Sequence, residues 1–415
     1  MDTLGGDKMI KLANDLGNGN IKATIDGEHV VFPSVIARLR EQDIQDPVVL
    51  SSKMAANKYF DHILDHLDIT VSSSAVKTGG RYLFGKAAVD SPLDLIGFDI
   101  NDYVGKSETD LSVILTLGLI AGKRVKEAFL NGELDGNNLT LQTDVAMTTA
   151  LPISEAKKPG VAVAYSKRYL GRTHTVTINN FKDPITVQIK FDMAQVALEG
   201  EIAHLYIVNG PEDLKNGIYE DFKAHYPEAA KLIDADQLVK TKNALTLDIG
   251  ADTADIAIIK DGVADARASL SAHQGYGWVL EQAIDVLQSQ QINFEDRTKL
   301  QEYLDTPTDP LGMARKKRVQ KVVDEQVEPL VDKIVLTVSR AVRNSNASLN
   351  LMFVHGGGSI PLAKNSDLRE KLENKLKSFT GGDDFYIVFV PEGDAAYCNE
   401  RGLELFLKAM VKDKG

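Results

Sequence analysis

Two turns that place an aspartate beside a glycine are the segments of this sequence best suited to chemistry. Asp15-Leu16-Gly17 ends one apolar run, and Asp248-Ile249-Gly250 ends another in the second half of the chain. Glycine amides can come close to an anion because no side chain intervenes, and they donate to phosphate oxygens. An aspartate at such a turn can hold the Mg²⁺ that neutralises a phosphate, usually through water. The pattern therefore predicts phosphate binding.

The two turns share the same local pattern. Each is a strand, an Asp-apolar-Gly turn, a second strand and an Asp-Gly turn, the last being Asp26-Gly27 and Asp261-Gly262. The interval between the copies is that of a whole domain, so the pattern indicates a duplicated domain rather than a short repeat. Two such turns facing each other would grip a triphosphate from both sides. Lys22, on the strand that leaves the first turn, could reach back as a point charge.

A third glycine cluster, Gly356-Gly357-Gly358, follows the apolar run 351–354. Ser359 and Pro361 come next, and these residue types open helices. Such a strand–glycine–helix element is an ordinary tight turn or part of a nucleotide site. The G-x-G-x-x-G spacing of dinucleotide-binding turns is absent here, which makes a Rossmann-type site the weaker alternative.

The elements that must position these turns follow from the apolar periodicity. The clearest helix is 109–130, with a buried face expected through Leu111, Ile114, Leu115, Leu119, Val125 and Phe129. The opening reads as a three-stranded meander. Strands are expected at 9–14, 20–25, 29–36, 82–84, 139–150, 173–178, 185–191, 244–247, 256–259, 351–354 and 385–390, and further helices at 327–342, after 359 and from about 394.

Composition limits the function classes. At 415 residues, 43% hydrophobic and 26% charged, the chain is long enough for two or three globular domains. The net charge of −12 argues against nucleic acid or an anionic membrane as the main partner. The single cysteine, Cys398, excludes an internal disulfide framework and fits a reducing cytoplasm. The longest apolar run, 113–122, is too short to span a bilayer. We therefore expect a cytoplasmic protein.

The three glycine motifs resemble, in order and spacing, the nucleotide motifs of the actin, chaperone and sugar-kinase superfamily. The segment 15–22 resembles its first phosphate motif, 248–255 its second, and 353–359 its adenosine motif. Within the superfamily, Gly17 to Lys22 followed by a hairpin and Phe32-Pro33-Ser34 is most similar to the plasmid-segregation actins, the ParM-like group.

The resemblance implies an α/β, actin-like fold of two duplicated domains around a nucleotide cleft. The first domain would span 1–194 and regain 395–415, and the second would span 195–394. The site would bind ATP or GTP with Mg²⁺, which Asp15 and Asp248 would hold largely through water. The nucleotide-binding residues carried over are Gly17, Asn18, Gly19, Asn20, Lys22, Gly250, Ala251, Asp252 and Thr253 for the phosphates, and Gly356, Gly357 and Gly358 for the adenosine.

The resemblance also implies a residue that orients the attacking water. In the superfamily it lies on the helix where the chain first crosses between domains, and 191–195 takes that place here. Gln195 is the candidate, with Glu199 one turn later in reserve, because an amide or carboxylate can orient water toward a γ-phosphate. An ordinary polar residue that opens a helix is the alternative reading of Gln195.

Two features depart from the family pattern. The second phosphate turn usually has a small or hydroxyl residue after its glycine, whereas this chain has Ala251 and Asp252. A carboxylate beside phosphates is unfavourable, so Asp252 is expected either near the metal or facing solvent. The segment 210–241 is longer than in the family and is interpreted as a surface insertion.

The function implied by the resemblance is an ATPase that polymerises with nucleotide, disassembles after hydrolysis and segregates plasmid DNA. A separate DNA-binding adaptor would contact the DNA, because nothing here is suited to reading bases. The alternative is a soluble small-molecule kinase of the same superfamily, with Asp144 or Glu199 as its base. A chaperone ATPase domain is a third reading, although the sequence shows no peptide-binding domain after the last helix.

Other features have ordinary explanations as well as functional ones. The basic cluster Arg315 to Arg318 with Lys321 is a solvated helix face, a subunit contact or a wall of the cleft. His62 and His66 are expected at the surface rather than on a metal. Trp278 is expected in the core or in a filament contact.

Overall fold

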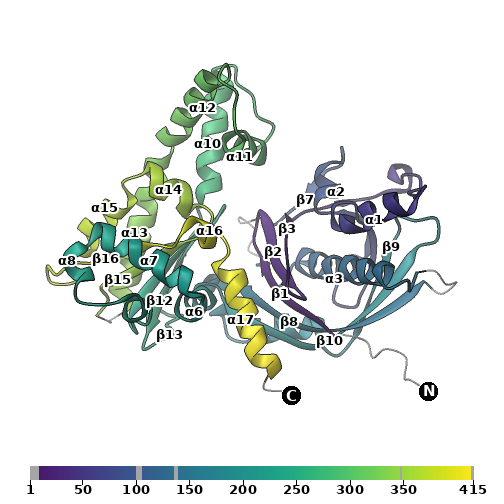
Figure 1. Cartoon of the computed structure of the whole chain (residues 1–415), viewed down its shortest axis with the longest axis horizontal. Coiled ribbons are helices and arrows are strands. Elements are labelled where there is room, and N and C mark those ends of the chain that lie inside the picture. The colour runs from purple at the N-terminus through teal and green to yellow at the C-terminus, as the bar shows by residue number, and fades with distance from the viewer. Residues whose placement is uncertain (1–8, 100–104, 135–138, 346–347, 413–415) are drawn as a thin grey trace. The chain divides into compact units, whose positions relative to one another are not determined.

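The computed structural model describes residues 9–99, 105–134, 139–345 and 348–412. The first eight residues of the predicted first domain lie outside this set. The chain forms two compact units (Figure 1). Unit 1 comprises Met1–Leu151, Lys158–Ala197 and Leu403–Gly415, and unit 2 comprises Pro152–Lys157 and Leu198–Gly402. The chain thus first passes into unit 2 at Pro152, and the main crossing comes three residues after the expected 194.

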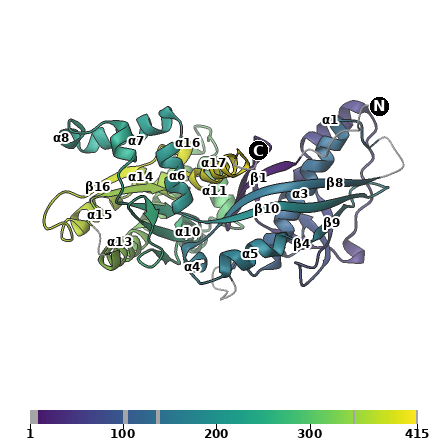
Figure 2. The same cartoon turned by 90° about the horizontal axis from the view of Figure 1, so that it is seen from below.

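Unit 1 is built on a mixed sheet, with the strand order β3-β2-β1-β8-β10-β9-β5-β6-β4-β7 among the described residues. Its long neighbours β8 and β10 run side by side (Figure 2). Helix α3, predicted from its apolar face, is almost entirely buried over its first three turns. The strands are β1 Ile10–Leu16, β2 Asn20–Ile25, β3 Glu28–Pro33, β4 Ile36–Arg38, β5 Asp68–Ser72, β6 Gly80–Phe84, β7 Leu95–Ile96, β8 Thr140–Leu151, β9 Thr173–Ile178 and β10 Ile185–Leu198; the helices are α1 Lys53–Asp61, α2 Lys86–Val89, α3 Asp110–Leu130 and α5 Val161–Tyr169, with two short 3₁₀ turns, Glu41–Asp43 and Ile63–Asp65.

Unit 2 is built on a second sheet, in the order β13-β12-β11-β15-β16, with β14 also paired to β12. Helix α13 contributes an apolar stripe to the core beneath this sheet. The strands are β11 Ala244–Ile249, β12 Ala254–Lys260, β13 Val263–Ala264, β14 Leu270–Ala272, β15 Leu351–His355 and β16 Tyr386–Phe389; the helices are α4 Ile153–Ala156, α6 Glu201–Asn209, α7 Glu212–His225, α8 Pro227–Ala230, α9 Ala235–Val239, α10 Tyr276–Ser289, α11 Arg297–Asp305, α12 Met313–Glu325, α13 Val327–Ser345, α14 Ser359–Asn365, α15 Leu368–Leu376, α16 Glu392–Ala395 and α17 Cys398–Lys412, whose later turns belong to unit 1.

The predicted duplication is present in the topology. In each unit a strand that ends in the aspartate turn pairs antiparallel with the next strand and parallel with a later one: β1 with β2 and β8, and β11 with β12 and β15. The Asp-Gly turns also match, since both residues have positive φ, 50° and 83° at Asp26-Gly27 and 53° and 81° at Asp261-Gly262. This conformation matches the twist of a tight hairpin.

The segment 210–241, interpreted from the sequence as a surface insertion, contributes to the core of unit 2. This segment forms α7 to α9, and Leu214, Ile218 and Phe222 of α7 are fully buried. Asp221 Oδ2 accepts from the amide of Phe389 at 2.8 Å, and the Tyr226 hydroxyl accepts from the amide of Ile387 at 2.9 Å. Because β16 ends the sheet, these side chains satisfy backbone groups that an edge strand would otherwise expose.

The helix expected at 191–195 is also absent. These residues continue β10, which lies between β8 and β9 in the sheet and remains extended as far as Leu198. Among the described residues, no helix has both the length and the apolar character needed to cross a membrane.

Candidate functional site

The first predicted phosphate turn joins β1 to β2. Asp15 lies near the end of β1, is 7% exposed and faces Lys22 in the strand register. The turn is held through its carbonyls. The Ser34 hydroxyl donates to Gly17 O at 2.6 Å, and the Ser34 amide donates to Gly19 O at 3.0 Å. Side-chain and backbone donors therefore hold the turn in one conformation without using its amides.

Lys106 provides a further support for this turn. Its Nζ donates to Leu16 O at 2.7 Å, although the two residues are far apart in the sequence. Ser34 was noted in the sequence only as part of the family resemblance, and Lys106 was not predicted. A lysine that bonds to a distant backbone carbonyl leaves no local sequence pattern.

The second predicted phosphate turn, 250–253, joins β11 to β12 in unit 2. The Gly250 amide closes the turn on Thr253 O at 2.9 Å. The start of α10 then donates to the turn's carbonyls, from Tyr276 N to Gly250 O at 2.9 Å and from Gly277 N to Ala251 O at 2.7 Å. Only glycine fits at Gly275, because a Cβ there would lie 2.4 Å from Gly250 O. As in unit 1, the carbonyls are tied to the protein.

Asp252, the residue that departs from the family pattern, is paired within the protein. Its carboxylate forms an ion pair with Arg297 at the start of α11, and Arg297 also lies 3.1 Å from Glu281. The Asp252 side chain is only 8% exposed. The expectation that it faces solvent is therefore wrong. In this structure the Arg297 guanidinium balances its charge.

The triple-glycine turn packs against the second phosphate turn inside unit 2. Gly358 N donates to Ile249 O at 2.8 Å, and Gly356 has a φ of +90°. A Cβ on Gly356 would lie 2.2 Å from Asp248 Oδ1 and 2.5 Å from Ile249 O. The two turns meet because they follow β11 and β15, which are neighbouring parallel strands.

Asp248 itself is oriented by groups from distant segments. The Asn399 side-chain amide donates to its Oδ2 at 2.8 Å, and Nδ1 of buried His355 lies 3.8 Å from its Oδ1. Next to this cluster, burial and then the nearby His355 lower the pKa of His204 on α6 to about 4. His204 is therefore neutral at physiological pH.

The two candidates for orienting water are in different environments. Gln195 is exposed on β10, so its predicted place on a crossing helix is wrong. Glu199 is 8% exposed and lies in the turn between β10 and α6. Of the two, Glu199 is the buried carboxylate at the point where the chain enters unit 2.

The other residues singled out from the sequence have structural surroundings. His62 and His66 are exposed, whereas Cys398 is buried, forms no disulfide and donates its thiol to Asp394 O at 3.5 Å. Trp278 is half-buried against the core of unit 2, and the basic cluster on α12 is exposed except for half-buried Lys316. In the described parts of the chain, no three histidine, cysteine or acidic side chains gather closely enough to form a metal cage.

Solved structures of actin-like proteins share this fold. The actin-like protein Alp7A matches with a TM-score of 0.66 at 16% identity, over 98% of both chains. Bacillus thuringiensis ParM with AMPPNP matches with a TM-score of 0.58 at 16% identity, over 98% of this chain and 99% of that one. The archaeal actin homologue Ta0583 matches at 0.57 and 15% identity, over 97% and 100%. The fold is therefore the actin-like fold that the motifs predicted.

Part of the chain also matches a sequence family. Residues 13–201 match the family model of the N-terminal domain of actin-like proteins. The match includes the first phosphate turn and both water-orienting candidates. No functionally curated protein matched the sequence.

Proposed function

We propose that this protein binds ATP or GTP with Mg²⁺, hydrolyses it, and assembles with copies of itself into filaments that segregate plasmid or similar DNA through an adaptor. The observation that carries the proposal is the duplicated turn. Each unit offers a glycine turn with its carbonyls bonded to the protein and an aspartate beside it. A ParM of the same fold was solved with AMPPNP and with ATP, which supports a nucleotide as the ligand.

The proposed roles follow from the local geometry. The amides of residues 17–19 and 251–253, with Lys22, would donate to phosphate oxygens, while the Gly250 amide stays bonded to Thr253 O. Gly356 to Gly358 would lie against the nucleoside.

The number and type of carboxylate side chains near the two turns fit Mg²⁺. Each unit supplies one aspartate near the phosphate turn, and Mg²⁺ in nucleotide sites is commonly held by one or two carboxylates together with phosphates and water. Asp15 and Asp248 would hold the ion, which would neutralise charge on the phosphates. Asn399 would keep the Asp248 carboxylate oriented.

Water orientation falls to Glu199 in this proposal. A buried carboxylate can accept a proton from water and fix its direction, whereas a side chain on an exposed strand face competes with bulk solvent. We expect hydrolysis to be slow in the free protein and faster in the polymer, where a neighbouring subunit would hold the two units in one arrangement.

Light scattering and pelleting of the purified protein with Mg²⁺ and ATP, GTP or no nucleotide test this function. We expect nucleotide-dependent pelleting, which an Asp248→Asn variant loses. Asp261→Asn is the matched control, because Asp261 lies in an exposed turn of the same unit and asparagine tolerates its positive φ. A protein that hydrolyses nucleotide yet stays small at every concentration would instead favour the small-molecule kinase.

The adaptor is tested separately. With a net charge of −12, the purified protein should not retard duplex DNA at physiological salt, and direct binding would make an adaptor unnecessary.

A further inference from the structure

Unit 1 carries a pocket of about 470 Å³ that the nucleotide proposal does not use. It opens between α5, the loop 74–77 and the segment 107–108 that precedes α3. Four cations line it, Lys77, Lys167, Arg168 and Arg172, against a single carboxylate, Glu108. A basic pocket on a chain of net charge −12 concentrates positive potential at one place on an acidic surface.

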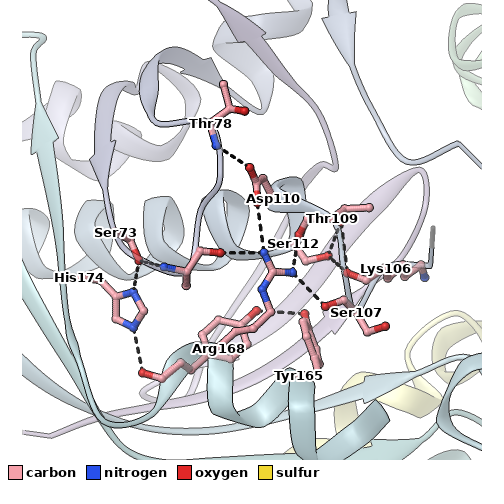
Figure 3. Close-up of polar contacts among 12 residues, drawn as sticks. Ser73, Thr78, Lys106, Ser107, Thr109, Asp110, Ser112, Tyr165, Arg168 and His174 are labelled. Carbon is pink, nitrogen blue, oxygen red and sulfur yellow. Dashed lines mark hydrogen bonds and ion pairs between the residues drawn. The ribbon is translucent and has the colours of Figure 1, made fainter. Parts of the chain in front are cut away.

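Arg168 builds the wall of this pocket rather than offering a free charge. Its Nη1 donates to Ser107 O at 2.9 Å and to Thr109 O at 2.7 Å, and its Nη2 donates to Ala75 O at 2.9 Å (Figure 3). It also lies 3.3 Å from Asp110. One side chain thus joins α5 to the two segments opposite it.

The other cations are available to a ligand to different degrees. Arg172 is tethered, with its Nη1 on the Ser74 hydroxyl at 3.2 Å and its Nη2 on Lys167 O at 3.3 Å. Lys77 and Lys167 are exposed, and within the part of the chain that the structure describes neither forms an ion pair. These two ammonium groups are the ones that can respond to a ligand.

The shape and chemistry favour an extended ligand over a compact polyanion. Apolar side chains, among them Ala75 and Val161, also line the pocket, and Glu108 would repel a dense cluster of phosphates. The same helix, α5, also exposes Val163, which is 59% accessible and follows the lining residue Val161 by two positions. Apolar surface flanked by cations is complementary to a peptide with apolar anchors and two or more carboxylates.

We propose that this pocket is a docking site for an acidic segment of a protein partner. The site differs from the phosphate turns, and its recognition combines Lys77 and Lys167 with the apolar surface of α5.

Hydrogen bonds through Lys106 connect the wall of the pocket to the first phosphate turn. The Lys106 carbonyl accepts from the Ser112 hydroxyl at 2.5 Å and the Thr109 hydroxyl at 3.2 Å, next to the carbonyls held by Arg168. From the same segment, Lys106 Nζ reaches Leu16 O (Figure 3 shows the pocket side of this network). Docking would therefore be coupled to nucleotide affinity through Lys106, a consequence that rests on the proposed nucleotide function. Such coupling is reciprocal.

A random 12-residue peptide library, selected on the full-length protein and counter-selected on a Lys77→Glu/Lys167→Glu variant, tests the docking site. We expect enrichment of peptides that combine apolar residues with two or more Asp or Glu. In fluorescence anisotropy, an enriched peptide should bind the charge-reversed variant at least ~10-fold more weakly than the parent protein. Lys53→Glu/Lys58→Glu, two exposed lysines on α1 of the same unit, is the matched control and should bind within about twofold of the parent.

Three results would overturn the docking site. They are no enrichment of acidic peptides, an equal loss of peptide affinity in the α1 control variant, and displacement of the peptide by polyphosphate or duplex DNA at a lower charge concentration than by polyglutamate.

The coupling between docking and nucleotide binding has its own readout. Peptide should change nucleotide affinity in the parent and not in Lys106→Met, while Lys106→Met still binds peptide. Peptide binding without any nucleotide binding would remove the coupling and the proposed function but leave the docking site standing.

Discussion

Asp252 and Arg297 lie 45 residues apart in the sequence and form a two-point ion pair in unit 2. The contact joins the second phosphate turn to the first turn of α11. A carboxylate inside a phosphate-binding turn would repel its ligand, and the guanidinium removes that repulsion. The pair therefore accounts for a residue that otherwise contradicts the motif.

Arg297→Gln should weaken triphosphate binding, because it leaves the Asp252 charge unbalanced beside the phosphates. We expect about a tenfold loss of ATP affinity, or ~1.4 kcal/mol, by titration calorimetry. Adding Asp252→Asn should restore most of it, since the two residues act as a pair. Arg318→Gln, an exposed arginine on α12, is the control. Additive losses in the double variant would show that Arg297 has another role.

Gly356→Ala should destabilise the protein much more than Gly357→Ala. The first places a Cβ 2.2 Å from Asp248 Oδ1 at a φ of +90°, whereas a Cβ on Gly357 meets nothing within 4 Å. We expect a loss of roughly 2–4 kcal/mol for Gly356→Ala and within ~0.5 kcal/mol for Gly357→Ala. Thermal and denaturant unfolding measure the difference. Equal stability of the two variants would contradict the packing of this turn against Asp248.

Glu199→Ala should abolish most of the hydrolysis while leaving nucleotide-dependent pelleting intact. Loss of a positioned base or water-orienting group costs on the order of 100-fold or more in rate. Gln195→Ala should hydrolyse at close to the parent rate, because its side chain is exposed on β10. Phosphate release measured alongside pelleting separates the two steps. A slow Gln195→Ala enzyme beside an unimpaired Glu199→Ala would reverse the assignment.

Stability should fall below neutral pH partly through His204. Its pKa is about 4 in the folded protein, mainly because of burial, against 6.5 as the ordinary value. The unfolded chain therefore takes up this proton first. The contribution of neutral His204 to the free energy of unfolding is fully present above pH 6.5 and is lost progressively as the pH falls to 4. The difference between the two pKa values corresponds to a loss of roughly 3 kcal/mol.

A His204→Gln variant should show a smaller drop in melting temperature between pH 7 and pH 4.5 than the parent protein. His62→Gln, an exposed histidine, should behave like the parent. If His204→Gln and the parent lose the same number of degrees, His204 is not the group that titrates.

The glycine turns could be predicted from the sequence because each depends on neighbours in the chain. Asp26-Gly27 and Asp261-Gly262 need positive φ at both residues, and Asp-Gly is a dipeptide that adopts it readily. The apolar runs on either side then determine the strands, and the duplicated order indicates two similar units. Helix α3 was evident for the same reason, from periodic apolar residues.

Tertiary structure decided what holds the two predicted phosphate turns, 17–19 and 250–253, and the neighbouring Asp248 in place. Arg297, Asn399, Ser34 and Lys106 each reach a turn from a distant segment, and a single polar contact between distant residues has no periodicity to detect. For Gln195 the prediction from local sequence was wrong. Its surroundings fit the start of a helix, whereas in the structure the residue lies within strand β10. A local conformational preference contributes less free energy than the hydrogen bonds and buried contacts that a residue gains in a sheet. Residues 191–195 therefore form a strand.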